Sequence, residues 1–269
     1  MPENAAGLLA RFRQMPNDSR AKTLIVALLL CLVCSVVVST AAVRLKPLQV
    51  ANADLDRKRN ILQVAGLLRE DRGIEDLFAN IETRIVDLDT GKYTDAVDSG
   101  TYDQRRAARD PALSEVLTGD EDVANIRRRA KYATVYLVRE NGALKTLVLP
   151  VHGYGLWSTL YGFLALQGDT RSVFGLQFYD HAETPGLGGE VDNPNWRAQW
   201  RGKLVFDEQN RPRLEVVKGR VTPGPDERYQ VDGLAGATLT SVGVSKLLRF
   251  WLGERGFGLY LANVREGMQ

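Results

Sequence analysis

The sequence contains almost no cysteine or histidine. Among its 269 residues, the cysteines are Cys31 and Cys34, and the histidines are His152 and His181. Beyond residue 34 the chain therefore cannot form a disulfide framework, a cysteine-based zinc site or a cysteine-ligated iron–sulfur cluster. Two histidines do not by themselves make a metal site, so we predict no metal centre.

An excess of charge of one sign is also lacking. The 35 Lys and Arg residues are nearly balanced by 33 Asp and Glu residues, which leaves a formal charge of +2. A nucleic-acid-binding protein usually has a basic excess or a basic face. Since neither is evident here, we predict no nucleic-acid partner.

One long stretch lacks charge altogether, from Leu24 to Val43. At about 1.5 Å per helical residue it reaches ~30 Å, the thickness of the hydrocarbon core of a bilayer. A cleaved signal peptide is the alternative, because "STAA" resembles a cleavage site, but the apolar core of a signal peptide is usually only about 7–15 residues long. We therefore predict a transmembrane helix over 24–43, in contact with membrane lipid and preceded by a tail over 1–23.

The two cysteines lie inside this segment with C-x-x-C spacing. A thiolate is strongly disfavoured in hydrocarbon, so we interpret Cys31 and Cys34 as small apolar side chains rather than as a redox pair. Basic residues flank the segment in nearly equal number, four over 11–22 and five over 44–59. The positive-inside rule therefore leaves the orientation open.

The remainder of the chain predicts an α+β fold with a largely antiparallel sheet. We expect a juxtamembrane helix and an N-terminal subdomain over 44–132, and a second domain over 133–269. The elements expected in the first part are a helix over 48–70, a short helix near 74–81, a strand over 83–93 and a solvated helix face at the basic run Arg127–Lys131. Those expected in the second are a hairpin turning at Asn141-Gly142, strands over 161–167 and 172–180, a short helix over 193–200 and a hairpin over 203–217.

The stretch "VDGLAGATLTSVGV", Val231 to Val244, is small and rich in hydroxyl groups, and an apolar helix follows it. We predict Thr240 or Ser241 as the helix N-cap and Gly253 as its end. The predicted buried face consists of Val244, Leu247, Leu248, Trp251 and Leu252. A helix N-terminus offers unpaired amide groups to a phosphate, and small residues let it approach. From the residues alone, an ordinary glycine-rich turn that caps a core helix is the favoured interpretation.

Within this stretch, "DGLAGATLTS" closely resembles the D-x-x-S-G-A-T motif at which flavin transferase attaches FMN to threonine through a phosphoester. The resemblance implies that Thr238 is the acceptor, that Asp232 is the motif acid and that Gly236 and Ala237 are the small residues before the acceptor. Ala235 stands where the motif usually has serine, which removes one hydroxyl and leaves the acceptor intact.

The resemblance extends along nearly the whole chain. The stretches "GYGLWSTLYGFLAL", "FYDHAETPGLGGEV", "NPNWRAQWRGK" and "FWLGERGFG" resemble the C subunit of the sodium-translocating NADH:quinone oxidoreductase, NQR. The resemblance implies a single-pass protein of the cell inner membrane whose FMN-binding domain, over 133–269, is periplasmic. It also implies an NADH:ubiquinone reductase subunit that is inactive alone and contacts the B, D and E subunits. Covalent FMN would relay electrons from an iron–sulfur centre to the flavin of the B subunit, coupled to sodium translocation.

The resemblance and the residue types suggest further flavin contacts, and no catalytic side chain is expected. From "GLWST" we expect an aromatic wall and two hydroxyl groups, from "ETPGLGG" a Gly/Pro-shaped loop, and from the helix start two residues beside the acceptor. The residues are Trp157, Ser158, Thr159, Glu183, Thr184, Leu187, Leu239 and Thr240.

Two other functions fit parts of this pattern. One is the G-type subunit of an RNF ferredoxin-linked complex, which shares the S-G-A-T-type motif. The other is a membrane-anchored periplasmic binding or assembly module without redox activity. The long matching stretches favour NQR over the first, and a covalently bound flavin would exclude the second.

Overall fold

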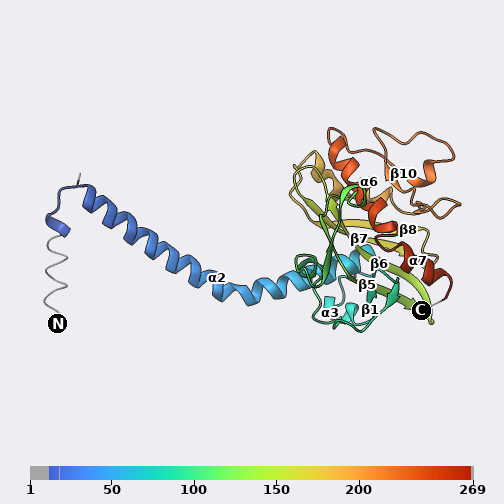
Figure 1. Ribbon diagram of the computed structural model, residues 1–269, viewed down its shortest axis with the longest axis horizontal. Coiled ribbons are helices and arrows are strands. Elements are labelled where there is room, and N and C mark those ends of the chain that lie inside the picture. The colour runs from blue at the N-terminus through green and yellow to red at the C-terminus, as the bar shows by residue number, and fades with distance from the viewer. Residues whose placement is uncertain (1–11, 18, 268–269) are drawn as a thin grey trace. The chain divides into compact units, whose positions relative to one another are not determined.

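The structure, a computed structural model, describes residues 12–17 and 19–267 (Figure 1). The chain divides into two compact units, Met1–Asp54 and Leu55–Gln269. Helix α2 (Arg20–Val64) makes up most of the described part of the first unit. Among the described residues it is the one helix that is long and apolar enough to cross a membrane. The predicted N-terminal apolar helix is therefore confirmed, and it continues through Pro47 into the helix predicted over 48–70.

Helix α2 ends six residues earlier than predicted because Gly66 stops it. Gly66 has a φ of +70°, in the left-handed region that glycine adopts without steric cost. Its amide donates to the Gln63 carbonyl at 3.1 Å, and the Leu67 amide donates to the Leu62 carbonyl at 2.8 Å. These two bonds form a Schellman motif, which satisfies the last carbonyl groups of the helix.

The second unit contains a six-stranded antiparallel sheet in the order β2-β1-β5-β6-β7-β8. Its strands are β1 (Glu82–Asp87), β2 (Lys92–Tyr93), β5 (Tyr132–Glu140), β6 (Ala143–Tyr154), β7 (Thr159–Gln167) and β8 (Val173–Asp180). The fold class and the predicted turn are confirmed, since Asn141 and Gly142 join β5 to β6 with φ values of 52° and 82°. Because β1 pairs with β5, the sheet crosses the position at which we place the 132/133 boundary.

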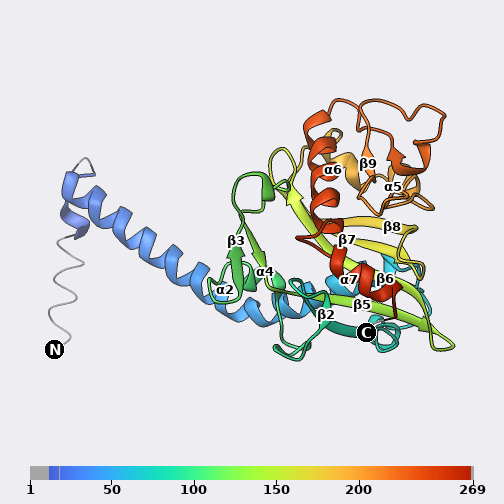
Figure 2. The same ribbon diagram turned by 45° about the vertical axis from the view of Figure 1, so that its right-hand side comes forward.

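Side chains alternate between two hydrophobic clusters on the two faces of this sheet. In β6, Leu147 and Leu149 belong to the larger cluster, which includes helices α6 (Thr238–Leu252) and α7 (Gly258–Arg265). Val148 belongs to the smaller cluster, which includes the end of α2 and Leu77 of α3 (Ile74–Phe78). Figure 2 shows α6 and α7 against the sheet. The predicted buried face of α6 is confirmed, and Gly253 is its C-cap.

The hairpin predicted over 203–217 forms only near its turn. An antiparallel bridge joins Phe206 to Pro212, and the Arg213 amide donates to the Val205 carbonyl at 2.9 Å. Asp207 closes the turn by accepting hydrogen bonds from the Gln209 and Arg211 amides. Pro212 also lacks an amide donor for a longer ladder. Further on, β9 (Glu215–Val216) pairs in parallel with β10 (Gln230–Val231). Strand β10 leads into the stretch Val231 to Val244 that contains the predicted acceptor, called the acceptor stretch below. The short helix predicted over 193–200 is confirmed as α5 (Pro194–Ala198).

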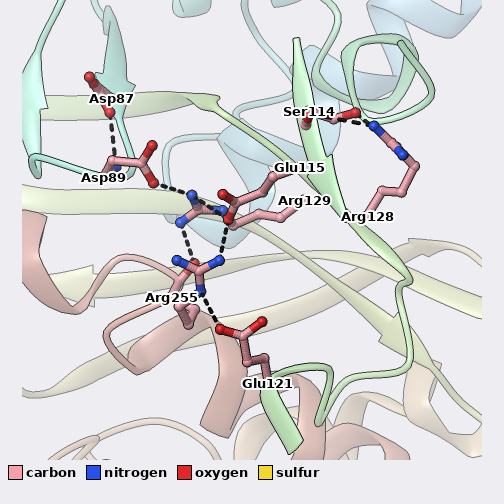
Figure 3. Close-up of polar contacts among 8 residues, drawn as sticks. All are labelled: Asp87, Asp89, Ser114, Glu115, Glu121, Arg128, Arg129 and Arg255. Carbon is pink, nitrogen blue, oxygen red and sulfur yellow. Dashed lines mark hydrogen bonds and ion pairs between the residues drawn. The ribbon is translucent and has the colours of Figure 1, made fainter. Parts of the chain in front are cut away.

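The basic run at 127–131 is also not a helix face. Its centre is β4 (Arg128–Ala130), which pairs with β3 (Ser114–Val116). The side chain of Arg129 is only 1% exposed; it forms ion pairs with Asp89 and, at 2.7 Å, with Glu115. It also donates to the Arg255 carbonyl at 2.8 Å, and Arg255 itself contacts Glu115 (Figure 3). The remaining short elements are α4 (Gln104–Ala107), η1 (Gly119–Glu121), η2 (Gly188–Asp192) and η3 (Glu227–Tyr229).

This network leads to a prediction about stability. Replacing Glu115 by Gln should lower the free energy of unfolding by about 1–3 kcal/mol, because the buried Arg129 guanidinium loses a charged partner. In an Arg129→Met background the same substitution should cost at least about 0.5 kcal/mol less. Urea unfolding of the full chain in detergent measures both effects. Glu121→Gln is the control, since among the described residues Glu121 has an ion pair with Arg255 alone, at 3.8 Å, and none with Arg129. Strictly additive effects of the two substitutions would contradict the coupling.

Candidate functional site

The predicted acceptor, Thr238, is the first residue of α6, and it is exposed. Ala237 is the N-cap and makes no side-chain cap bond, so the predicted N-cap at Thr240 or Ser241 is wrong. The helix begins earlier because Gly236, with a φ of +71°, turns the backbone before it and the Ser241 amide already bonds the Ala237 carbonyl. Ser241 has a different partner, since its hydroxyl accepts a hydrogen bond from the Leu234 amide at 3.0 Å.

The motif acid, Asp232, is held among backbone and side-chain partners. Its carboxylate accepts a hydrogen bond from the Val221 amide at 2.7 Å. Its carbonyl accepts from the Trp196 indole at 2.8 Å, and its amide donates to the Gln199 side chain. The adjacent Gly233 amide bonds the Gly219 carbonyl at 2.7 Å. Asp232 therefore fastens the loop around residues 219–221 beside the acceptor stretch.

The "GLWST" segment is the short connection from β6 to β7. Thr159 begins β7 and pairs with Tyr154, the last residue of β6. Between them, the Trp157 side chain is 67% exposed, which is unusual for the largest apolar side chain. The Ser158 hydroxyl accepts a hydrogen bond from the Ala182 amide at 2.8 Å, which ties this connection to the segment after β8.

Glu183 lies at the centre of these segments, with only 5% of the residue exposed. Its Oε1 accepts hydrogen bonds from the amides of Leu156, Trp157 and Ser158 at 3.1, 3.0 and 3.2 Å. Its Oε2 accepts from the Thr240 hydroxyl at 2.7 Å, and Thr240 is fully buried. Burial alone would raise the pKa of this carboxyl, but the bonds from Thr240 and the amides outweigh it and lower the pKa.

The "ETPGLGG" segment forms a closed turn. The carbonyl of Thr184 accepts from the amides of Leu187 and Gly189 at 3.1 and 2.9 Å, and the Thr184 side chain is exposed. The Leu187 side chain is exposed as well and touches the acceptor stretch, since a Cβ on Gly236 would lie 2.9 Å from its Cδ2. The turn after β8 and the turn before α6 are therefore in direct contact.

The structure thus brings the predicted site residues into one connected surface. Trp157, Leu187 and Leu239 present exposed apolar groups, while Thr238 presents a hydroxyl at the start of a 15-residue helix. Such a helix start suits a phosphate, and exposed apolar side chains suit the face of a planar ring. The arrangement fits a phosphorylated aromatic group such as FMN. Asp232, Glu183 and Thr240 support the surface, with their polar atoms bonded inside the protein.

Three glycines are part of this site and were not singled out from the sequence. A Cβ on Gly155 would lie 2.6 Å from Oε1 of Glu183, and one on Gly188 would lie 2.6 Å from the Thr240 hydroxyl. A Cβ on Gly243 would lie 2.5 Å from the Tyr154 carbonyl. Each position allows two segments to approach closely. Their presence in the quoted stretches is the signal that could have found them.

The chain resembles known proteins both in one domain and over nearly its whole length. Residues 155–253 match the FMN-binding domain family, so the second unit contains an FMN-binding domain. Over 256 residues the chain is 54% identical to the C subunit of the Na(+)-translocating NADH-quinone reductase of Pseudomonas aeruginosa, covering 93% of this chain and 98% of the relative. The C subunit of the same reductase from Vibrio alginolyticus is 50% identical, with 93% and 97% covered.

Solved structures agree with these relatives. The crystal structure of Shewanella oneidensis NqrC superposes with a TM-score of 0.73 at 34% identity, covering 80% of this chain and 99% of that one. The structure of the C subunit from Parabacteroides distasonis gives 0.64 at 25% identity, with 81% and 96% covered. The chain therefore belongs to the NqrC family, the C subunits of the Na(+)-translocating NADH-quinone reductase.

The contacts of Asp232 lead to a prediction about local order. Asp232→Ala should speed hydrogen exchange of the Val221 amide by at least about tenfold, because a charge-assisted hydrogen bond contributes roughly 1.5–3 kcal/mol. Asp232→Asn, which keeps an oxygen acceptor, should change the exchange less. Hydrogen exchange measured by mass spectrometry over 217–224 compares the variants. Unchanged protection in Asp232→Ala would show that other contacts hold the loop.

Proposed function

We propose that this protein is the electron-carrier subunit of a sodium-translocating NADH:quinone oxidoreductase and that it carries FMN covalently on Thr238. Membership of the NqrC family and the FMN-binding domain support the role in this oxidoreductase complex. The RNF-type alternative is not favoured, because the relatives that cover nearly the whole chain are NADH-quinone reductase subunits. The protein would act only within the assembled complex.

The choice of acceptor rests on accessibility. Of the three hydroxyl groups between Val231 and Val244, only that of Thr238 belongs to an exposed residue. Thr240 is fully buried and donates to Glu183, while the buried Ser241 accepts from Leu234. Ala235, which stands where the motif usually has serine, is exposed and offers no hydroxyl group as an alternative acceptor.

The attachment would be a phosphoryl transfer catalysed by a flavin transferase. With a flavin dinucleotide as donor, Thr238 Oγ bonds to the phosphorus that carries the riboflavin unit. The P–O bond to the second nucleotide breaks, and that nucleotide leaves with the electron pair. The hydroxyl proton passes to a base of the transferase. The start of α6 supplies amide groups near the resulting phosphate.

Bound FMN would supply the redox chemistry, and the chain would hold and orient it. Trp157, Leu187 and Leu239 would hold the isoalloxazine through their exposed apolar groups, and the hydroxyls of Thr159 and Thr184 would be its hydrogen-bond partners. The Ser158 hydroxyl would not bond the flavin, because it already accepts a hydrogen bond from the Ala182 amide and donates one to Glu183. Electrons would pass from an iron–sulfur centre of the membrane subunits to the flavin of the B subunit.

The long apolar helix and the family membership fit an inner-membrane protein. We propose further that the flavin domain is periplasmic and that the B, D and E subunits are its neighbours. Covalent attachment suits this location, because a flavin released into the periplasm would be lost from the complex.

The central prediction concerns Thr238. Thr238→Val should abolish covalent flavin after co-expression with flavin transferase, because no hydroxyl remains, whereas Thr238→Ser should keep it. Both changes affect an exposed residue and should alter the free energy of unfolding by no more than ~1 kcal/mol. In-gel fluorescence of denatured protein and intact mass detect the bond. A fluorescent Thr238→Val variant would refute the acceptor, and a dark wild type would refute the covalent flavin and favour a binding or assembly module.

Topology gives a separate prediction. A reporter that is active only in the periplasm should work when fused after Gln269 and fail when fused before Leu24. A reporter that is active only in the cytoplasm should give the opposite result with the same two fusions. If the C-terminal fusion were active only in the cytoplasm, the periplasmic placement of the flavin domain would be wrong.

A further inference from the structure

Glu183 combines burial, charge and an unusual number of donors. Its two carboxylate oxygens accept the amides of Leu156, Trp157 and Ser158, the Ser158 hydroxyl at 3.4 Å and the Thr240 hydroxyl at 2.7 Å. The donors belong to two segments far apart in the chain, the β6–β7 connection and the first turn of α6. Because both oxygens of this buried carboxylate accept hydrogen bonds from the chain, we assign Glu183 a structural role rather than a role in binding a ligand.

The backbone of Glu183 is fixed as well. Its amide donates to Nδ1 of His181 at 3.3 Å, so this nitrogen carries no proton. The other nitrogen, Nε2, then donates to Asp192 at 2.9 Å. His181 therefore helps to hold the backbone of Glu183 from the β8 side.

Two glycines pack closely against the Glu183 carboxylate. A Cβ on Gly155 would lie 2.6 Å from one carboxylate oxygen, and a Cβ on Gly188 would lie 2.7 Å from the other. Both segments reach Glu183 because these residues are glycines. All of these contacts are between residues of the chain itself.

We propose that Glu183 is a positioning residue for flavin attachment. By holding Thr240 it orients the first turn of α6, and with it the Thr238 hydroxyl two residues earlier. By holding three consecutive amides it also fixes the loop that carries Trp157. This inference rests on the proposed function, since it assigns Glu183 a role in loading the flavin onto Thr238. It differs from a direct flavin contact, because the Glu183 carboxylate is buried and both of its oxygens accept hydrogen bonds from this chain.

The test measures the initial rate of covalent loading of the full chain in detergent, with purified flavin transferase and a flavin dinucleotide. Glu183→Ala and Thr240→Val should load roughly ten- to a hundredfold more slowly, because displacement of a reacting group by about 1 Å has effects of this size. Thr240→Val preserves side-chain volume and removes one hydrogen bond. Glu183→Gln should recover much of the rate, because its Oε1 can still accept the three amides and its Nε2 can donate to Thr240.

Asp207→Ala is the matched control. Asp207 is 7% exposed and accepts the amides of Gln209 and Arg211 at 2.9 and 2.8 Å, so its removal also deletes a buried, amide-bonded carboxylate. None of its hydrogen-bond partners belongs to the flavin site. Its loss should lower the thermal midpoint by an amount similar to that in Glu183→Ala and leave the loading rate within about twofold of wild type.

The outcomes separate the two proposals. If wild type loads and both Glu183→Ala and Thr240→Val load at the wild-type rate, the positioning role is wrong and the proposed function stands. If Asp207→Ala slows loading as much as Glu183→Ala, the effect is general instability and the positioning role is also wrong. If Glu183→Ala fails to fold, Thr240→Val and Glu183→Gln decide. If wild type does not load at all, the proposed covalent function fails, and the role of Glu183 in loading fails with it.

Discussion

The ladder between β6 and β7 is the part of the structure on which the candidate site depends. It runs without interruption from Thr146 paired with Gln167 to Tyr154 paired with Thr159. Its end leaves only residues 155–158 to cross between the strands. The Gly155 amide bonds the Ser158 carbonyl, and the other three amides bond Glu183, outside the ladder. Helix α6 packs on the same strand, with the Trp251 indole bonded to the His152 carbonyl at 2.7 Å. Strand β6 therefore positions both the β6–β7 connection and helix α6.

Two buried ionic groups connect distant segments of this domain in the same way. Arg129 joins β4 to Asp89, Glu115 and the Arg255 carbonyl, and Glu183 joins the β6–β7 connection to α6. Each charge is compensated by several partners, which is the condition under which a buried charge is tolerated. The loss of any one partner would leave a buried charge less well compensated, at a cost in free energy. Both groups therefore restrict how far the segments they connect can move apart.

The sequence predicted those helices and strands that are determined by residues close together in the chain. Charge-free length predicted α2, runs of strand-forming residues and Asn141-Gly142 predicted β5 to β8, and apolar spacing predicted the buried face of α6. The family resemblance supplied the site residues. The failures involve contacts between remote residues: the burial of Arg129, the parallel pair β9–β10 and the earlier start of α6. Helix-start preferences favoured Thr240, but its hydroxyl has a partner 57 positions away at Glu183.

The burial of Thr240 and Ser241 also has a stoichiometric consequence for the proposed relay. If Thr238 carries the flavin as proposed, the single exposed hydroxyl-bearing residue between Val231 and Val244 would limit this stretch to one covalent flavin, which could store no more than one pair of electrons at a time. An upstream donor that delivers a further electron must wait until the flavin has passed one on. In the proposed relay, the turnover of the whole assembly would then be bounded by the slower of the two electron transfers, into and out of this flavin. Adding exposed hydroxyl groups elsewhere on α6 would not relieve that bound, since they would lack the surface on which a flavin can lie.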